Sequence, residues 1–205
     1  MKTREKILKS AWKLFAKDGF EAVSVRDVTQ HADVNLASVN YHFGSKSGLV
    51  QEIVVEAIVP MNKQRVLLLK KAGDKVGGVE NVQMQALIES FVRPVVCPEE
   101  YGGCSDMMAR LMARYLIDRD YDVPNKVMES FGDVYQIFSI AIRAQCPGMH
   151  PKKALEKLIF STGAVFMFQS FSGLAAKATG NESALKVDDY LSDAVAFCEA
   201  GFKAE

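Results

Sequence analysis

The chain has few of the residues on which metal sites and disulfide frameworks depend. It contains four cysteines and three histidines, and no two cysteines form a C-x-x-C pair. The histidines do not cluster with the cysteines, which argues against a structural zinc site. We therefore expect reduced cysteines. In the alternative, Cys97 and Cys104, next to Pro98 and two glycines, form a redox switch in a loop.

Long apolar runs and catalytic motifs are also missing. No stretch gives about 18 uncharged apolar residues in a row, and the first apolar segment is an amphipathic helix interrupted by Lys9, Lys13 and Lys17 rather than a signal peptide. We therefore expect a cytoplasmic protein without a membrane partner. No nucleophile elbow, phosphate-binding glycine loop or H-E-x-x-H motif occurs, so we expect no enzyme, no cofactor and no bound metal.

Charge is balanced over the whole chain but not along it. The chain carries 25 Lys and Arg against 25 Asp and Glu, and 49% of its residues are hydrophobic. Residues 1–46 hold 8 basic against 5 acidic side chains, which leaves 17 against 20 for the rest. This asymmetry agrees with nucleic-acid contact at one end of a chain made of a small and a larger domain.

Two short helices joined by a tight turn are predicted within residues 24–46. Ser24, with Asp27 three residues later, is the pattern of a capping box that opens the first helix. The turn follows at Asp33, and Asn35 can cap the second helix through the backbone amides of its first turn. This arrangement is typical of a DNA-binding helix-turn-helix.

The second of these helices carries side chains that suit a DNA groove. Val39 and Phe43 are four residues apart and can pack inward. On the remaining surface, Ala37 can contact a thymine methyl group, Ser38 can form a hydrogen bond, and Asn40 can make a bidentate contact with adenine. Phosphate contacts suit three further residues: Tyr41, His42 and Lys46.

The sequence V-N-Y-H-F-G-S-K, preceded by a three-residue turn and an S-V-R-D-V helix, resembles the tetracycline-repressor-type family of transcriptional regulators. The resemblance covers residues 3–50. It implies that Arg26 contacts a base edge and that the tyrosine, histidine and lysine of this stretch contact phosphates. The family's turn often carries Gly where this chain has Asp33, and Asp tolerates the left-handed conformation better than most residues.

Apolar residues recur at helical spacing along the whole chain, and no stretch alternates as a strand would. We therefore expect an all-α fold of about nine helices, with a three-helix DNA-binding domain in residues 1–48 and an effector-binding and dimerisation domain in residues 49–205. Thr3 should cap the first helix, Pro60 should kink or end the fourth, and Pro94 and Pro98 together should close the fifth near residue 96. The expected helices cover residues 3–17, 25–32, 36–43, 46–71, 82–96, 105–117, 124–145, 151–178 and 187–202.

The stretch FSTGAVFMFQSFSGLAA, residues 160–176, is nearly apolar on all sides. In a chain of 22.6 kDa this favours a homodimer, in which the last two long helices form a four-helix bundle with their symmetry mates. The alternative is the central core helix of a monomer. Two helix-turn-helix domains related by a two-fold axis, the DNA readers of the dimer, would recognise a palindromic operator in double-stranded DNA. The family resemblance implies the same arrangement.

The larger domain is rich in methionine and aromatic residues, which can line an apolar cavity or form an ordinary core. The resemblance implies a repressor that a small apolar effector releases from DNA by changing the spacing of the two readers. The R-L-M-A-R and F-S-G-L-A-A-K-A stretches are faintly similar to sensors of fatty acids or their thioesters, and hydrophobic drugs are comparable candidates. A domain that only dimerises or binds a protein partner is the alternative. The candidate pocket residues are Met108, Met112, Tyr115, Phe131, Tyr135, Phe138 and Phe166.

Overall fold

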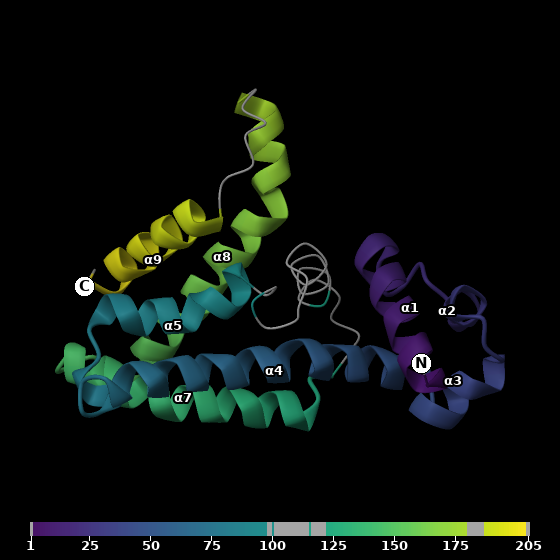
Figure 1. Ribbon diagram of the computed structural model, residues 1–205, viewed down its shortest axis with the longest axis horizontal. Coiled ribbons are helices and arrows are strands. Elements are labelled where there is room, and N and C mark those ends of the chain that lie inside the picture. Colours follow the sequence, from purple (N-terminus) through teal and green to yellow (C-terminus); the bar gives the residue numbers. More distant parts are fainter. Residues whose placement is uncertain (1, 98–99, 101–114, 116–121, 180–186, 204–205) are drawn as a thin grey trace. The chain divides into compact units, whose positions relative to one another are not determined.

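The computed structural model describes residues 2–97, 100, 115, 122–179 and 187–203, and these are helical or lie in turns and loops (Figure 1). The all-α prediction is confirmed. The helix expected over residues 105–117 lies outside the described residues except for Tyr115, which is helical. The elements are α1 (Thr3–Asp18), α2 (Val25–Ala32), α3 (Leu36–Phe43), α4 (Lys46–Asp74), the 3-10 helix η1 (Val79–Asn81), α5 (Met84–Val96), α7 (Asn125–Gln145), α8 (Pro151–Thr179) and α9 (Val187–Lys203).

The first helix begins as predicted but is capped by a different residue. Lys2, not Thr3, is the N-cap, and its backbone N–H donates to Glu5 Oε2 at 3.1 Å. The prediction was wrong by one position because Glu5, at the third helical position, bonds to the backbone of Lys2 rather than to a side-chain hydroxyl. At the other end, Gly19 has φ 92° and donates to Phe15 O at 3.0 Å, which ends α1 at the predicted Asp-Gly pair.

Pro60 and Pro94 do not end their helices. Pro60 stands within α4, which runs on to Asp74, beyond the predicted end at residue 71, and the kink expected at Pro60 stays a prediction. Pro94 lies within α5, which ends at Val96 as predicted. A proline removes only one backbone donor, and apolar packing on both sides can sustain the helix through it.

The chain forms two compact units. The first contains Met1–Val59 and the described residues of Asp106–Met128, and the second contains Pro60–Ser105 and Glu129–Glu205. Helix α4 contributes to both. The domain boundary expected after residue 48 stays a prediction, because a continuous helix passes through it.

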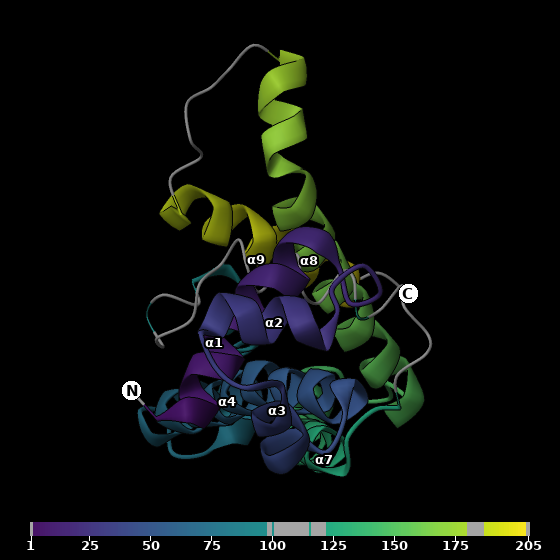
Figure 2. The same cartoon turned by 90° about the vertical axis from the view of Figure 1, so that its right-hand side faces the viewer.

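The first unit is built on the apolar face of α1. Helix α1 contacts α2 and α3, which also contact each other (Figure 2). Phe15 and Phe20 lie with ring centroids 5.3 Å apart, and the ring of Tyr115 meets Phe20 edge-on at 6.3 Å. Val28 from α2 and Val39 from α3 are fully buried. This core fixes the angle between the two helices of the predicted DNA reader.

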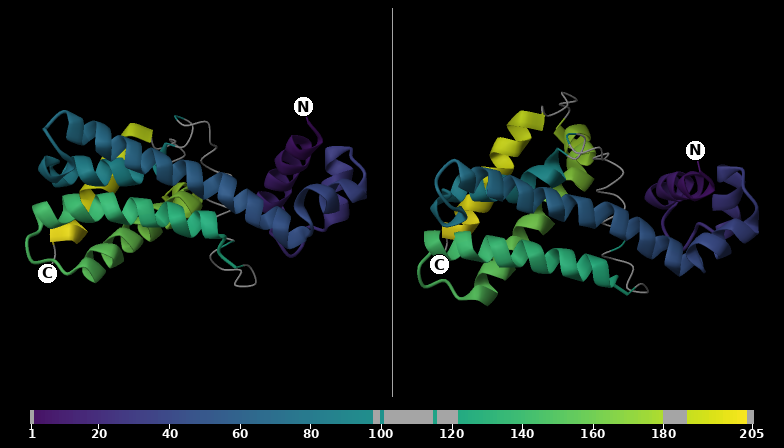
Figure 3. Two further views of the ribbon diagram at one scale, coloured as in Figure 1. Left: turned by 90° about the horizontal axis from the view of Figure 1, so that it is seen from below. Right: turned by 60° about the horizontal axis from the view of Figure 1, so that its bottom comes forward.

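The second unit is a helical bundle. Helix α5 contacts both α8 and α9, and α7 runs beside the C-terminal part of α4 (Figure 3). Asn62 Nδ2 of α4 donates to Ser130 Oγ of α7 at 3.0 Å. Lys157 Nζ of α8 donates to Gly201 O at 2.6 Å, and so satisfies a backbone carbonyl at the end of α9.

Candidate nucleic-acid interface

The start of α2 is fixed by the predicted capping box. The Ser24 hydroxyl and the Ser24 backbone N–H donate to Asp27 Oδ2 at 2.6 and 2.8 Å. In return, the Asp27 backbone N–H donates to Ser24 Oγ at 3.2 Å. The hydroxyl bond, followed by the backbone bond, holds the pKa of the Asp27 carboxyl below its usual value. The capping prediction is confirmed.

The turn between α2 and α3 also follows the prediction. Asp33 adopts the left-handed conformation, with φ 52° and ψ 58°, which an Asp can hold without a glycine. The Val34 N–H donates to Thr29 O at 3.1 Å. Asn35 Oδ1 then accepts from the Ala37 N–H at 2.9 Å and starts α3. Local hydrogen bonds therefore set the geometry of the helix-turn-helix.

Helix α3 has one buried and one exposed side. Val39 is fully buried and Phe43 is half-buried, as expected of the inner face. The ring of Tyr41 is 86% exposed. The exposed and half-buried residues of the outer surface include every base-contact candidate of this helix: Ala37, Ser38 and Asn40.

The other candidate DNA contacts lie around this surface. Arg26 is exposed on α2, and His42 is exposed with its ring 5.0 Å from that of Tyr41. Lys46 is half-buried, and its Nζ donates to Glu21 O at 3.3 Å. The ammonium group has three N–H donors, so two remain for a phosphate. The candidates thus lie in one compact unit, and their DNA contacts stay a prediction.

Sequence reasoning missed the residues that hold α3 in place. The Arg4 guanidinium pairs with Glu52, lies 3.6 Å from Glu56 Oε1, and stands 5.6 Å over the ring of Phe43. Arg4 thereby ties α1 and α4 to the end of the predicted recognition helix. At Gly48, an added Cβ would lie 2.1 Å from Phe43 O. Only glycine permits this approach between α3 and α4.

A histidine of α2 contacts α1. His31 is exposed, and its Nδ1 lies 2.9 Å from Ser10 Oγ of α1. This bond helps to fix α2 on α1. Nothing in the local sequence around either residue indicates the pairing, because they are 21 positions apart.

The described candidates for the effector pocket are distributed over both units. Tyr115 belongs to the first unit, and its hydroxyl donates to Asp122 O at 3.1 Å. Burial, followed by the charge of Asp122, raises the pKa of Tyr115. In the second unit, Phe138 and Phe166 are buried, Tyr135 is half-buried and Phe131 is exposed. The two methionine candidates, Met108 and Met112, lie outside the described residues.

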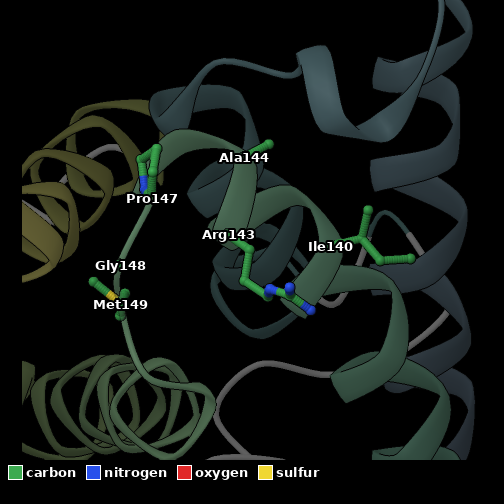
Figure 4. A pocket seen from close by; sticks show the side chains of 6 residues that line it. All are labelled: Ile140, Arg143, Ala144, Pro147, Gly148 and Met149. Atoms are coloured by element: carbon green, nitrogen blue, oxygen red, sulfur yellow. The ribbon is translucent and has the colours of Figure 1, made fainter.

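A separate depression lies where α7 ends. It has a volume of about 450 Å³. It shares no residue with the predicted pocket. Its lining consists of Ile140, Arg143, Ala144, Pro147, Gly148 and Met149 (Figure 4).

Two other kinds of site are not found in the described parts of the chain. No group of three or more His, Cys, Asp and Glu side chains there is placed to hold a metal ion. None of the described helices combines the length and the hydropathy needed to cross a membrane.

Known proteins resemble this chain over both units. The chain is similar to the probable HTH-type transcriptional regulator YttP of Bacillus subtilis (strain 168), with 44% identity over 54 residues, and the match covers 26% of each chain. A putative tetR family transcription regulator from Shewanella sp. PV-4 has a TM-score of 0.66 at 13% identity, with 98% of each chain covered. HlyIIR, a hemolysin II transcriptional regulator, has a TM-score of 0.62 at 17% identity, covering 99% of this chain and 98% of that one. These two structures establish likeness of fold only.

Two family descriptions match most of the sequence. Residues 7–53 match "Bacterial regulatory proteins, tetR family", and residues 89–201 match "Tetracyclin repressor-like, C-terminal domain". The first match includes the helix-turn-helix, and the second covers more than half of the chain. Members of this family are DNA-binding transcription factors rather than enzymes. This chain therefore belongs to the tetR family of transcriptional regulators.

Proposed function

We propose that the protein is a repressor that binds a palindromic operator as a homodimer and leaves it when a small apolar effector binds the second unit. The observation that carries the DNA-binding part is the two-sided character of α3. Its inner face is fixed by Val39, Phe43 and the Arg4 contacts, while its small and polar side chains stay exposed or half-buried. A rigid helix with such an outer surface suits the major groove.

The proposed contacts fall into two classes. Arg26, Ala37, Ser38 and Asn40 would contact base edges and so select the sequence. The phosphate contacts would position the reader without selecting a sequence, and they would come from Tyr41, His42 and Lys46.

Dimerisation is supported by an apolar stripe along α8. Leu155, Ile159, Gly163 and Met167 recur at every fourth position, and all four are exposed. Ile159 is 60% exposed, and the neighbouring Phe160 is 72% exposed. Such a stripe on one face of a helix is typical of a surface that packs against another chain.

Helix α9 presents a similar surface. Phe197 is 69% exposed, with Ala196, Ala200 and Gly201 exposed beside it. A Cβ added at Gly163 of α8 or at Gly201 would meet no heavy atom of the described residues within 4 Å. Small residues in an exposed apolar stripe let a second helix approach closely. We infer that α8 and α9 of two protomers form a four-helix bundle.

The effector is proposed to be a fatty acid, an acyl thioester or a hydrophobic drug. Effector binding would favour one of two spacings of the paired readers. Operator affinity would then fall by a factor set by the ratio of the effector's affinities for the two spacings. The aromatic residues of α7 and α8 named above are the candidates for its contacts.

Control by a protein partner or by oxidation is the alternative. Oxidation requires an accessible thiolate. Cys97 is buried, none of the three described cysteines is in a disulfide, and Cys104 lies outside the described residues. The burial of Cys97 therefore favours a small effector over a Cys97–Cys104 switch.

Selection of bound duplexes from a random DNA pool tests the proposal. The purified protein should enrich a palindrome, and its affinity for that duplex should fall steeply with salt, since several phosphate contacts release counterions. A variant that carries both Arg26→Ala and Asn40→Ala is the matched control, because these residues are exposed and would contribute to base readout without supporting the core. If the folded, dimeric protein enriches no sequence, the proposal is wrong.

A further inference from the structure

Arg65 carries a charged group into the interior of the second unit. Its side chain is 1% exposed. The Nε donates to Phe91 O of α5 at 2.9 Å, and Nη1 donates to Asn62 Oδ1 at 3.0 Å. The guanidinium also lies 4.0 Å over the ring of Phe91. Three contacts therefore hold its orientation.

The hydrogen bonding of this guanidinium is incomplete. Nη2 has no hydrogen-bond partner among the described residues. No carboxylate in the described ranges forms an ion pair with Arg65, and Asn62, which accepts from Nη1, is itself tied to Ser130 Oγ. The immediate partners of the buried charge are thus neutral. A buried charge normally requires an opposite charge or full hydrogen bonding.

The group is nevertheless charged at neutral pH. Burial alone lowers the pKa of Arg65 from its ordinary value to about 9, and no neighbouring charge contributes to the shift. The protein thus keeps a cation in an apolar interior and leaves two N–H donors of Nη2 unpaired. An anionic oxygen placed against Nη2 would satisfy both the charge and the donors.

We propose that Arg65 Nη2 binds the anionic head group of the effector, and that the effector is an apolar molecule with one carboxylate. This inference rests on the proposed function and selects among its effectors. The apolar part would lie against the aromatic side chains around this site, of which Phe91 and Phe138 have ring centroids 5.3 Å apart. A neutral alcohol of the same chain length would leave Nη2 unpaired. A cationic amine would place like charges together.

Matched probes test the head group. The full chain, without DNA, is titrated calorimetrically with carboxylates from hexanoate to hexadecanoate, and with the alcohol, the amine and the alkyl phosphate of the chain length that binds best. The carboxylate should bind saturably and about 10- to 100-fold more tightly than the alcohol, because a hydrogen bond to a charged group is at stake. The amine should not bind. No saturable carboxylate binding, or a preference confined to the phosphate, would overturn the assignment.

Variants then identify Arg65 as the anchor. Arg65→Met, which keeps much of the side-chain volume, should lose the preference for carboxylate over alcohol. Asn62→Asp should lose it as well, because it places a carboxylate next to Arg65 while the arginine remains. Arg143→Met, in the depression at the end of α7, should bind as the wild type does. If Arg65→Met fails to fold, Asn62→Asp decides, since a new internal ion pair should raise its unfolding temperature.

The outcome can be separated from that of the proposed function. Operator binding is measured without probes for the wild type and for both variants at Arg65 and Asn62. Intact operator binding with an unchanged carboxylate preference in folded Arg65→Met would refute the role of Arg65 alone. Failure of the wild type to select any DNA sequence would refute the proposed function, whatever the probes show.

Discussion

The buried guanidinium of Arg65 makes the free energy of unfolding vary with pH in the alkaline range. Its pKa is about 9 in the folded chain, well below that of an arginine in the unfolded chain, so above pH 9 the unfolded chain binds more protons than the folded one. The contribution of Arg65 to stability is therefore lowest below pH 9 and rises as the pH increases through 9.

This sign leads to a prediction for Arg65→Met. On going from pH 7 to about pH 10.5, the free energy of unfolding of the wild type should gain about 2 kcal/mol relative to that of the variant. Urea denaturation of both proteins at the two pH values measures the difference, and titration of shared groups cancels. An equal difference at both pH values would contradict the burial of a charged Arg65.

Two residues of the predicted DNA interface should respond differently to replacement by alanine. Arg26→Ala should cost about 1–3 kcal/mol of discrimination at one base position, because Arg26 would read a base edge. Lys46→Ala should weaken binding to all sequences and reduce the salt slope by about one unit, because the ammonium would bind phosphate. Binding to the operator and to single-base variants at several salt concentrations separates the two effects.

The exposed Lys13 on α1 supplies a control of equal charge. Lys13→Ala should change operator affinity and salt slope less than Lys46→Ala, since Lys13 is no part of the predicted interface. Equal effects of the two lysine variants would indicate a general electrostatic attraction rather than a phosphate contact by Lys46.

Side chains with local partners could be predicted from the sequence, and those with distant partners could not. Ser24 and Asn35 were identified because a helix cap bonds within three residues of itself. Arg4 and Arg65 were missed because Arg4 meets Glu52 across 48 positions and Arg65 meets Phe91 across 26. Such pairs have no periodic pattern. They arise only when helices pack.

At the scale of the helix, two glycines differ in whether a side chain would fit in their place. At Gly48 in the first turn of α4, an added Cβ would lie 2.1 Å from Phe43 O, whereas at Gly132 in α7 nothing lies within 4 Å among the described atoms. Gly48→Ala should therefore destabilise the protein by about 1–3 kcal/mol, because the backbone must shift. Gly132→Ala should stabilise it by up to about 1 kcal/mol through helix propensity.

Thermal and urea unfolding of the two alanine variants measure this contrast. Operator affinity adds a second readout, since a shift at Gly48 moves the end of α3 but one at Gly132 does not reach it. If Gly48→Ala is as stable as the wild type and binds DNA equally well, the close approach of α3 and α4 is not required.

Helix positions could be predicted well because the apolar residues keep a helical period over most of the chain. The error at the end of α4 has a specific cause. Gly73 lies beyond the predicted end at residue 71 but belongs to the helix, where an added Cβ would come within 2.9 Å of the Val79 side chain. This glycine lets the chain fold back over the helix end. From the sequence alone, this glycine cannot be distinguished from a glycine in a loop.

At the scale of the whole molecule, the packing of one chain does not explain why large apolar side chains of α8 and α9 are exposed. Phe160 and Phe197 are each more than two-thirds exposed although they are large and apolar. The sequence predicted a helix too apolar for one inner face but could not say which residues would lie outside. Burial of neighbours such as Val165 and Phe166 now separates the core face of α8 from the proposed interface.

Phe160→Glu should separate the dimer without unfolding the protomer. The side chain is 72% exposed, so a charge there costs little in one chain, whereas in the proposed four-helix bundle it would be desolvated without a partner. Sedimentation velocity should show monomers, and circular dichroism should show unchanged helix content. Val76→Glu, also at an exposed apolar residue but outside α8 and α9, should remain dimeric.

Operator binding by Phe160→Glu tests whether dimerisation is needed for tight DNA binding. A palindrome is bound tightly because one dimer places two readers on two half-sites, so a monomer must bind each half-site separately and loses most of the affinity. The variant should therefore bind the full operator little better than a single half-site, while Val76→Glu should discriminate as the wild type does. A Phe160→Glu protein that remains dimeric and selective would show that the exposed apolar surface of α8 around Phe160 is not part of the dimer interface.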